Sequence, residues 1–120
     1  MTGQTILIAG PYRSGTGDDP GRMEQNLRTL EQHALAVYRK GHLPLIGEWV
    51  ALPLMAVAGS QRVGDKIYET FAYPVASRLI RRCDAVLRIE GASVGADEDV
   101  RQATELGLAV YRSLDQVPQA

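Results

Sequence analysis

"ILIAGPYRSG", residues 6–15, is an apolar run that stops abruptly at a glycine and a proline. Four apolar residues in succession, Ile6–Ala9, are typical of a strand that is buried on both faces of a parallel sheet. The Gly10-Pro11 pair ends the strand, and Arg13-Ser14-Gly15 follow in a loop. A cationic, hydroxyl-bearing loop at this place indicates either a phosphate-binding loop at the rim of a sheet or a simple turn. The rest of the sequence is needed to distinguish these two interpretations.

The composition is ordinary for one globular domain that spans residues 1–120. Apolar residues make up 45% and charged residues 22%, which is far from a disordered composition. A formal net charge of -1 argues against nucleic acid and anionic membranes as partners. The single cysteine, Cys83, excludes an internal disulfide and a thiolate metal site. Since no apolar run approaches about 18 residues and no signal-peptide pattern is present, the expected compartment is the cytoplasm.

Hydrophobic periodicity predicts strands that alternate with helices. The expected strands are residues 4–9, 42–46, 84–90 and 108–112, and the expected helices are residues 22–40, 48–59, 66–82 and 96–107. Pro53 is expected to allow a break in the second helix, and Pro74 either to sit in the first turn of the third helix or to kink it. This order predicts an α/β fold, a flavodoxin-like (Rossmann-like), doubly wound parallel sheet of four to five strands with helices on both faces.

Three stretches with unusual residues fall at the carboxyl ends of predicted strands. They are residues 10–15, residues 47–49 with the only tryptophan, and residues 91–99, "GASVGADED". Ligands of open parallel sheets bind outside these strand ends, where the strand order reverses. The candidate binding residues are Gly10, Arg13, Ser14, Gly15, Glu48, Trp49, Ser93, Gly95 and Ala96. Taken one at a time, the glycines are explained equally well by turn geometry, Arg13 by solvation and Trp49 by burial in the core.

Three acidic residues, Asp97, Glu98 and Asp99, stand in the first turn of the last predicted helix. Carboxylates there complement the helix dipole, and Ser93 or Asp97 is a candidate N-cap, which is a purely structural explanation. The same dipole is expected to keep such a carboxylate ionised. An ionised carboxylate beside a sugar ring acts as a nucleophile or stabilises an oxocarbenium-like transition state.

The loop at the end of the first strand supplies groups of a complementary kind. Arg13, Ser14 and backbone amides suit a phosphate, and Tyr12 or Trp49 can stack on a base. Together with the acidic residues, they describe a site for a nucleoside or nucleotide with a carboxylate aimed at its glycosidic bond. The two histidines and the cysteine have no motif partner, and structural roles are expected for them.

Four blocks of the chain resemble one family of proteins. They are "ILIAGPYRSG", "GHLPLIG", "RRCDAVLRIEG" and "SVGADEDVRQATELGL", and they lie in this order between residues 6 and 108. They resemble the small bacterial and phage proteins grouped as nucleoside 2-deoxyribosyltransferase-like, including the domain family numbered 4406. The resemblance implies a flavodoxin-like fold, dimers or larger oligomers, and no metal or other cofactor. It also implies either transfer of deoxyribose between bases or hydrolysis of the N-glycosidic bond of nucleoside monophosphates.

The resemblance implies catalytic roles for particular residues. The family's nucleophilic glutamate stands four residues after the glycine of the Ser-x-Gly block, and here that position is Asp99, with Glu98 beside it. One residue rotates a helical side chain by about 100°, so only one of these two carboxylates faces the substrate, and Asp99 is the expected one. Tyr12 is expected to orient it, and Arg13 to hold a phosphate. The hydrolases carry a second carboxylate eight residues before the aspartate that opens the third strand, and here Ala76 replaces it.

Two functions are therefore compatible with the sequence. The first is an N-glycosidic hydrolase or a deoxyribosyltransferase-like enzyme. The second is a catalytically silent protein that binds a nucleotide in the same cleft, which Ala76 favours unless Glu48 or Glu69 supplies the missing carboxylate. The expected partners are a small nucleoside or nucleotide and further copies of the same chain. A homodimer or tetramer would bury the apolar residues 50–59 or the helix after them.

Overall fold

Residues 3–120, the part of the chain that the computed structural model describes, contain a four-stranded parallel sheet. Its strands are β1 (Thr5–Ala9), β2 (Leu43–Leu45), β3 (Ala85–Arg88) and β4 (Ala109–Tyr111). β1 pairs with β2 on one side and with β3 on the other, and β4 pairs with the outer side of β3, always in parallel. The order β2-β1-β3-β4 matches the first four strands of the flavodoxin order. The predicted doubly wound parallel fold is confirmed.

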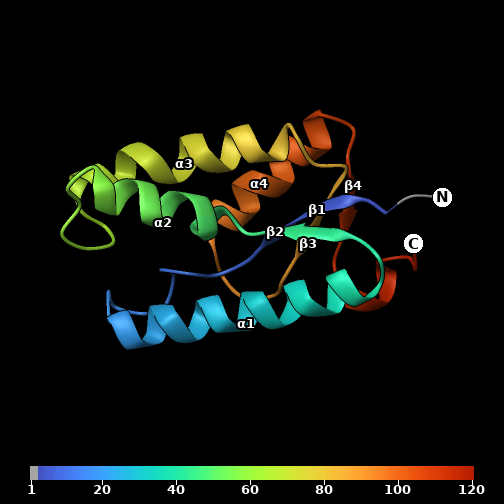
Figure 1. The fold of residues 1–120 in the computed structure, drawn as a ribbon, viewed down its shortest axis with the longest axis horizontal. Coiled ribbons are helices and arrows are strands. Elements are labelled where there is room, and N and C mark those ends of the chain that lie inside the picture. The colour runs from blue at the N-terminus through green and yellow to red at the C-terminus, as the bar shows by residue number, and fades with distance from the viewer. Residues whose placement is uncertain (1–2) are drawn as a thin grey trace.

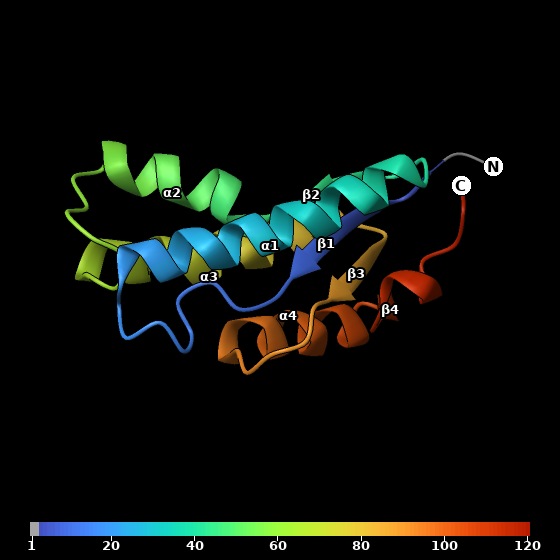
Figure 2. The ribbon, with the colours of Figure 1, turned by 90° about the horizontal axis from the view of Figure 1, so that it is seen from below.

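Helices cover both faces of the sheet. They are α1 (Pro20–Arg39), α2 (Gly47–Val57), α3 (Lys66–Ile80) and α4 (Val94–Glu105), and a short 3-10 helix, η1 (Leu114–Gln116), follows β4. Figure 1 shows α1 below the sheet and α2, α3 and α4 above it. In Figure 2, which looks from below, α1 lies nearer to the viewer than α3. Strands as apolar as β1 and β3 require this cover on both sides.

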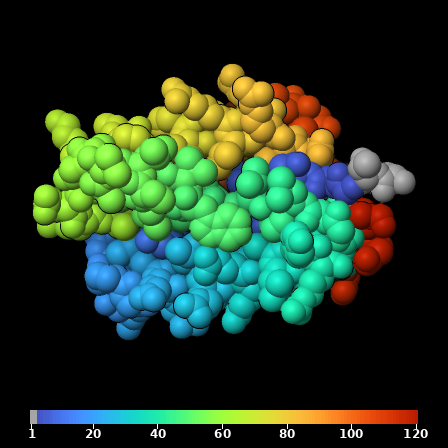
Figure 3. Space-filling model, in the orientation of Figure 1, coloured from blue at the N-terminus to red at the C-terminus, as the bar shows by residue number. Residues whose placement is uncertain are grey.

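α2 and α3 form a helical hairpin that carries the chain from β2, at one edge of the sheet, to β3 (Figure 1). The hairpin extends beyond the strands, and α2, in green in Figure 3, lies on the surface of the molecule. Its exposed apolar side chains are Trp49, Val50, Leu54 and Val57. Among residues 3–120, no helix combines the length and the apolar character that are needed to cross a membrane.

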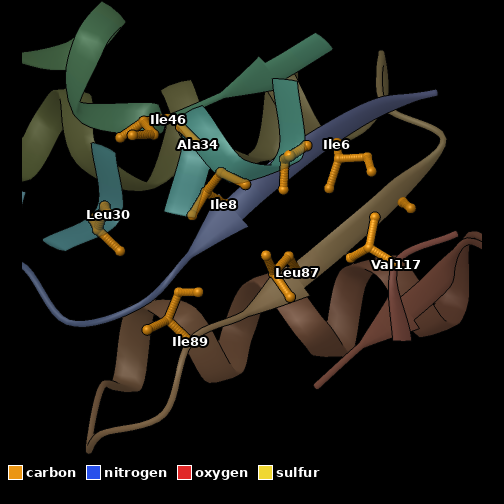
Figure 4. Packing of buried hydrophobic residues seen from close by; sticks show 10 residues of the cluster. Ile6, Ile8, Leu30, Ala34, Ile46, Leu87, Ile89 and Val117 are labelled. Atoms are coloured by element: carbon orange, nitrogen blue, oxygen red, sulfur yellow. The ribbon is translucent and has the colours of Figure 1, made fainter. Parts of the chain in front are cut away.

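Two groups of buried side chains form the core, one on each face of the sheet. On the face covered by α1, Ile6 and Ile8 of β1 pack with Leu87 of β3 and with apolar residues of α1 (Figure 4). On the opposite face, Leu7 and Val86 pack against the end of α3 and against α4. Neighbouring strand residues belong to different groups because successive side chains of a strand point to opposite faces. This packing fixes β1 and β3 side by side, with their carboxyl ends at the same rim.

The structure corrects one prediction about a proline and narrows another. α2 continues through Pro53 without a break, and of the two places expected for Pro74 the first turn is excluded, because Pro74 lies in the interior of α3. α3 begins at Lys66 because the Asp65 carboxylate accepts a hydrogen bond from the backbone N–H of Tyr68 at 2.9 Å. An interior proline removes one backbone hydrogen bond. The packing of α2 and α3 against each other holds both helices together despite this loss.

The chain changes sides of the sheet at β1 and β3. α1 leaves β1 over one face, whereas α4 leaves the neighbouring β3 over the other face. A crevice opens between two such connections, at the carboxyl ends of the strands, and it is the usual ligand site of this architecture. The loop of residues 10–19 and the loop of residues 89–93 stand on its two sides.

Candidate functional site

A cleft of about 620 Å³ lies at the carboxyl end of β1. Its walls come from the β1–α1 loop, the beginning of α2, one side of α3 and the beginning of α4. The polar side chains that line it are Tyr12, Arg13, Ser14, Asp18, Glu48, Tyr68, Glu69, Tyr73, Ser93 and Asp99. Small-molecule sites measure about 300–1,000 Å³, so the cleft has room for a nucleoside-sized ligand. The three stretches singled out in the sequence meet here, as their positions at strand ends predict.

The floor of the cleft requires a glycine where β1 ends. A Cβ atom at Gly10 would lie 2.9 Å from Cβ of Ile89 and 2.9 Å from Cδ2 of Leu30, which is closer than side chains pack. The loop beyond it is closed on itself, because the buried Thr16 donates a hydrogen bond from its hydroxyl to the Arg13 carbonyl at 2.5 Å. Gly10 therefore has a packing role, and the loop presents Arg13 to the cleft.

Arg13 is the only cation among the described residues that line the cleft, and a carboxylate already binds it. Its Nε donates to Oδ1 of Asp18 at 2.7 Å, and its Nη2 donates to Oδ2 at 3.3 Å. The guanidinium lies 5.9 Å from the centre of the Tyr68 ring. It also rests against Gly64, where a Cβ atom would come within 2.5 Å of Nη2. Arg13 thus bridges the β1–α1 loop and the loop that precedes α3. An incoming phosphate would have to share the Arg13 guanidinium with Asp18 or displace the Asp18 carboxylate from it.

α4 begins at Val94, earlier than predicted, so Asp97 alone of the three acidic residues lies in its first turn, and the three side chains point in different directions. Ser93, one of the two candidate caps, is the N-cap, and its Oγ accepts the backbone N–H of Ala96 at 3.1 Å. Asp99 lines the cleft, whereas Glu98 pairs with Arg101 and does not line it. This division follows from the rotation of about 100° per helical residue, and it leaves Asp99 rather than Glu98 in the cleft.

Asp99 is not held in the ionised state, which corrects the expectation drawn from the helix dipole. Burial is the first cause that raises the pKa of its carboxyl to about 7. The negative charges of Glu48 and Glu98 act in the same direction, and only the Arg88 cation opposes them. Desolvation governs the pKa of Asp99, which lies beyond the first turn of α4, where the effect of the helix dipole falls off. Near neutral pH, Asp99 is therefore present in both charge states.

Glu48 brings a second carboxyl group into the cleft, from the first turn of α2. Burial raises the pKa of Glu48, and a hydrogen bond with its own backbone opposes the rise. Ala76 of α3 lines the same cleft, so the position where the resemblance places a second carboxylate faces this space without one. Since Glu48 raises the pKa of Asp99 through its charge, the two carboxyls disfavour each other's ionisation.

Two phenols lie close to the carboxyl groups. Burial and the charge of Glu48 raise the pKa of Tyr12, and the same causes raise the pKa of Tyr68 to about 12. Both hydroxyls therefore stay protonated near neutral pH and are available as hydrogen-bond donors. The cleft combines two titrating carboxyl groups with neutral donors, a set that suits the oxygen atoms of a sugar.

Most of the predicted site residues lie in the cleft. Those that line it are Gly10, Tyr12, Arg13, Ser14, Glu48, Ser93, Gly95, Ala96 and Asp99, and those that do not are Gly15, Trp49 and Glu98. Trp49 is 41% exposed, and its indole Nε1 donates to Oε2 of Glu31 on α1 at 2.9 Å. Glu48 and Trp49 are neighbours on one helix, so they cannot both face the cleft. A base that enters the cleft does not meet the Trp49 ring.

Two residues that line the cleft, Tyr68 and Asp18, and one residue beside it, Arg88, escape the sequence-based prediction. Tyr68 stands on α3, and its helical spacing gives no sign that this face meets the end of a strand. Asp18 pairs with Arg13 across a loop, and no sequence motif marks such a pair. Arg88 does carry a signal: it is a cation in the otherwise apolar strand "AVLR", where every residue is buried. A charged side chain that is buried in a strand needs a partner in the folded protein, so Arg88 is a signal that the sequence itself offers.

The histidines and the cysteine have structural surroundings. His42 is buried; its Nδ1 accepts the backbone N–H of Gln4 at 2.9 Å, and its Nε2 lies 2.6 Å from the Pro118 carbonyl oxygen. Cys83 is buried in the core group on the α4 face. In the described part of the chain, no three His, Cys, Asp or Glu side chains form a group that could hold a metal ion.

Comparisons with known proteins add no assignment to this geometry. No protein-family model matches the chain, and no curated protein matches it either. The resemblance to nucleoside 2-deoxyribosyltransferase-like proteins therefore stays a prediction. The candidate site is defined by its own residues: two half-buried carboxyls, two phenols and a paired arginine at the rim of a parallel sheet.

Proposed function

We propose that the protein cleaves the N-glycosidic bond of a nucleoside or nucleotide, by hydrolysis or by transfer of the sugar to another base. One observation supports this most: Asp99 of α4 and Glu48 of α2 face the same cleft, and burial raises the pKa of both. Two carboxyls that interact in this way titrate as a pair. Near neutral pH, Asp99 is present in both charge states beside Glu48, whose pKa is also raised, and glycoside cleavage needs one carboxylate and one carboxylic acid.

Asp99 is the nucleophile in this proposal, and Glu48 is the acid. The reaction therefore uses the arrangement in which Glu48 holds a proton and Asp99 is ionised, although the charge of an ionised Glu48 favours the proton on Asp99. A carboxylate oxygen of Asp99 attacks the anomeric carbon C1′, the C1′–N bond breaks, and its electron pair leaves with the base. Glu48 donates its proton to the departing base, which therefore leaves as a neutral molecule. Water, or the ring nitrogen of a second base, then attacks C1′, releases the Asp99 carboxylate and gives its proton to Glu48.

The remaining polar groups of the cleft bind and orient the substrate. Tyr12 and Tyr68 stay protonated, so they donate hydrogen bonds to sugar oxygens or to the carboxylate of Asp99. Arg13 is the cation that a 5′-phosphate would meet, but Asp18 already accepts from two of its nitrogens. A monophosphate has to compete with Asp18, whereas an unphosphorylated nucleoside does not.

Binding without turnover is the second candidate function, and Ala76 favours it. This residue lines the cleft where the resemblance implies a carboxylate, and Asp99 is one methylene shorter than the glutamate of that family. A shorter nucleophile holds its oxygens farther from C1′. Positioning errors near 1 Å cost about a hundredfold in rate.

Release of free base from a panel of substrates separates the two candidates. The panel contains ribonucleosides, deoxyribonucleosides and their 5′-monophosphates, and base release is measured by chromatography beside ligand-induced shifts in the thermal unfolding midpoint. We expect at least one member of the panel to release its base. Thermal shifts without base release would support the silent binding protein and contradict the enzyme. If no member of the panel gives a thermal shift or releases its base, both proposed functions are wrong.

A further inference from the structure

Arg88 is a charged residue buried at the end of β3, and the proposed reaction does not use it. It is 8% exposed and pairs in register with Ala9 of β1. Side chains alternate along a strand, so Arg88 occupies the same face as Val86, the face that α3 and α4 cover. An apolar side chain would fill this place without the desolvation cost of a buried guanidinium. The charge therefore calls for a physical reason.

The partners of Arg88 neutralise it only in part. Nη1 donates to the Ile89 carbonyl, and Nη2 donates both to the Gly91 carbonyl and to Oδ1 of Asp97, each at 2.9 Å. The Nε atom is buried and has no hydrogen-bond partner among the described residues. The Asp97 side chain is 71% exposed, so water screens its charge far more than that of Arg88. The buried guanidinium therefore has a strongly solvated counter-ion and one nitrogen without a partner among the described residues.

The same contacts fix the turn that leads into α4. Two of the hydrogen bonds go to the backbone carbonyls of Ile89 and Gly91, between β3 and α4. The third goes to the side chain of Asp97 in the first turn of α4. Gly91 in this turn has φ of 120° and lies against the β1–α1 loop, where its Cβ would come within 2.8 Å of Cγ of Pro11. Asp99 follows Asp97 by two residues on the helix, so Arg88 helps to fix the place from which Asp99 faces the cleft.

Charged groups from three elements act on Asp99. Glu48 from α2 and Glu98 from α4 disfavour its ionisation, and Arg88 from β3 favours it. Asp97 lies on the same helix turn as Asp99. The other titratable or charged groups that line the cleft are Tyr12, Arg13, Asp18, Tyr68, Glu69 and Tyr73.

We infer that Arg88 is a positioning residue for Asp99: through its hydrogen bonds to Ile89, Gly91 and Asp97, it anchors the β3–α4 turn from which Asp99 faces the cleft. The catalytic meaning of this role rests on the proposed function. The effect on Asp99 itself does not depend on turnover, so it is measurable whether or not the protein is an enzyme.

The test is the titration of the Asp99 side-chain carboxyl, followed by its ¹³C chemical shift against pH. We expect Arg88→Met to raise the titration midpoint by about one pH unit, since a nearby opposite charge lowers the pKa of a carboxyl by about 1–3 units. Arg88→Lys, which keeps a charge but loses the forked hydrogen bonds, should restore most of this shift. The matched control is Arg112→Met, which removes an exposed cation that does not act on Asp99 and should leave the midpoint nearly unchanged.

An unchanged midpoint in folded Arg88→Met would overturn the inference. If Arg88→Met fails to fold, Asp97→Asn is measured instead. This substitution removes the acid that partly neutralises Arg88, so we expect it to lower the titration midpoint of Asp99. A midpoint that stays or rises in Asp97→Asn contradicts the role of Arg88. Failure of the proposed function looks different: no base is released from any substrate, while the Asp99 midpoint still responds to Arg88.

Discussion

Asp99 destabilises the folded protein whenever it is ionised. Its pKa rises from 3.8 to about 7 on folding, chiefly through burial, so the folded state holds this proton more tightly than the unfolded state. A raised pKa of this kind gives a contribution to stability that is fully present below pH 3.8 and is lost as the pH rises through about 7. A destabilising carboxyl in a cleft is a physical sign of a functional role.

We expect Asp99→Asn to stabilise the protein at pH 8 and to have little effect near pH 4. At about 1.4 kcal/mol for each pKa unit, the gain at pH 8 is on the order of a few kcal/mol in the free energy of unfolding. Urea denaturation at the two pH values measures it. Glu98→Gln is the matched control, since Arg101 lowers the pKa of Glu98 and no gain at pH 8 is expected. An equal gain at both pH values, or no gain at pH 8, would contradict the raised pKa.

At the scale of elements, one side chain organises the wall of the cleft that α3 forms. The Asp65 carboxylate accepts backbone N–H groups of Gln61 at 2.8 Å and of Tyr68 at 2.9 Å, and also the Ser60 hydroxyl at 2.9 Å. These bonds lower its pKa to about 2. They join the loop of residues 60–65 to the start of α3, and this loop supplies the glycine surface on which the Arg13 guanidinium rests.

Asp65→Ala should therefore lower the thermal unfolding midpoint more than Asp19→Ala does. Both residues are N-caps, but the Asp19 side chain makes no capping hydrogen bond. The lowered pKa means that the contribution of Asp65 is present above pH 3.8 and is lost as the pH falls through about 2. The difference between the two variants should shrink over that range. Equal losses at neutral pH would show that the carboxylate does not organise the loop.

The elements themselves were largely predictable, for reasons that particular segments make clear. β1 and β3 are short apolar runs between turn residues, and α1 has clear helical spacing, so local signals suffice for them. The break predicted at Pro53 is wrong because local propensity opposes a helix that the packing of α2 on α3 maintains. The pKa of Asp99 lay beyond prediction, because it depends on burial and on Glu48, about fifty residues earlier in the chain.

At the scale of the whole molecule, α2 leaves an apolar surface uncovered. Val57 is 90% exposed and Leu54 is 48% exposed, and both lie on the outer helix that Figure 3 shows on the surface. Apolar patches of this kind on small domains commonly mark contacts between proteins. A second copy that packs through α2 would bury this surface, which agrees with the expected homodimer or tetramer.

Light scattering at tens of micromolar protein should give the mass of a dimer or tetramer. Leu54→Glu combined with Val57→Glu should shift the mass to that of a monomer, because each charge would have to be buried in the interface. Leu106→Glu is the control, since this residue is 49% exposed at the end of α4, away from α2. A monomer mass for the unchanged protein, or an oligomer that the double variant leaves intact, would contradict the role of α2.

The central claim is that Asp99 attacks the anomeric carbon, and base release by two neighbouring variants tests it most directly. Asp99→Asn keeps the shape of the side chain but cannot act as a carboxylate nucleophile, whereas Glu98→Gln changes a side chain that Arg101 binds outside the cleft. We expect Asp99→Asn to abolish base release while substrate affinity, measured by calorimetry, stays nearly the same, and Glu98→Gln to remain active. Full activity of Asp99→Asn beside an inactive Glu98→Gln would contradict the account.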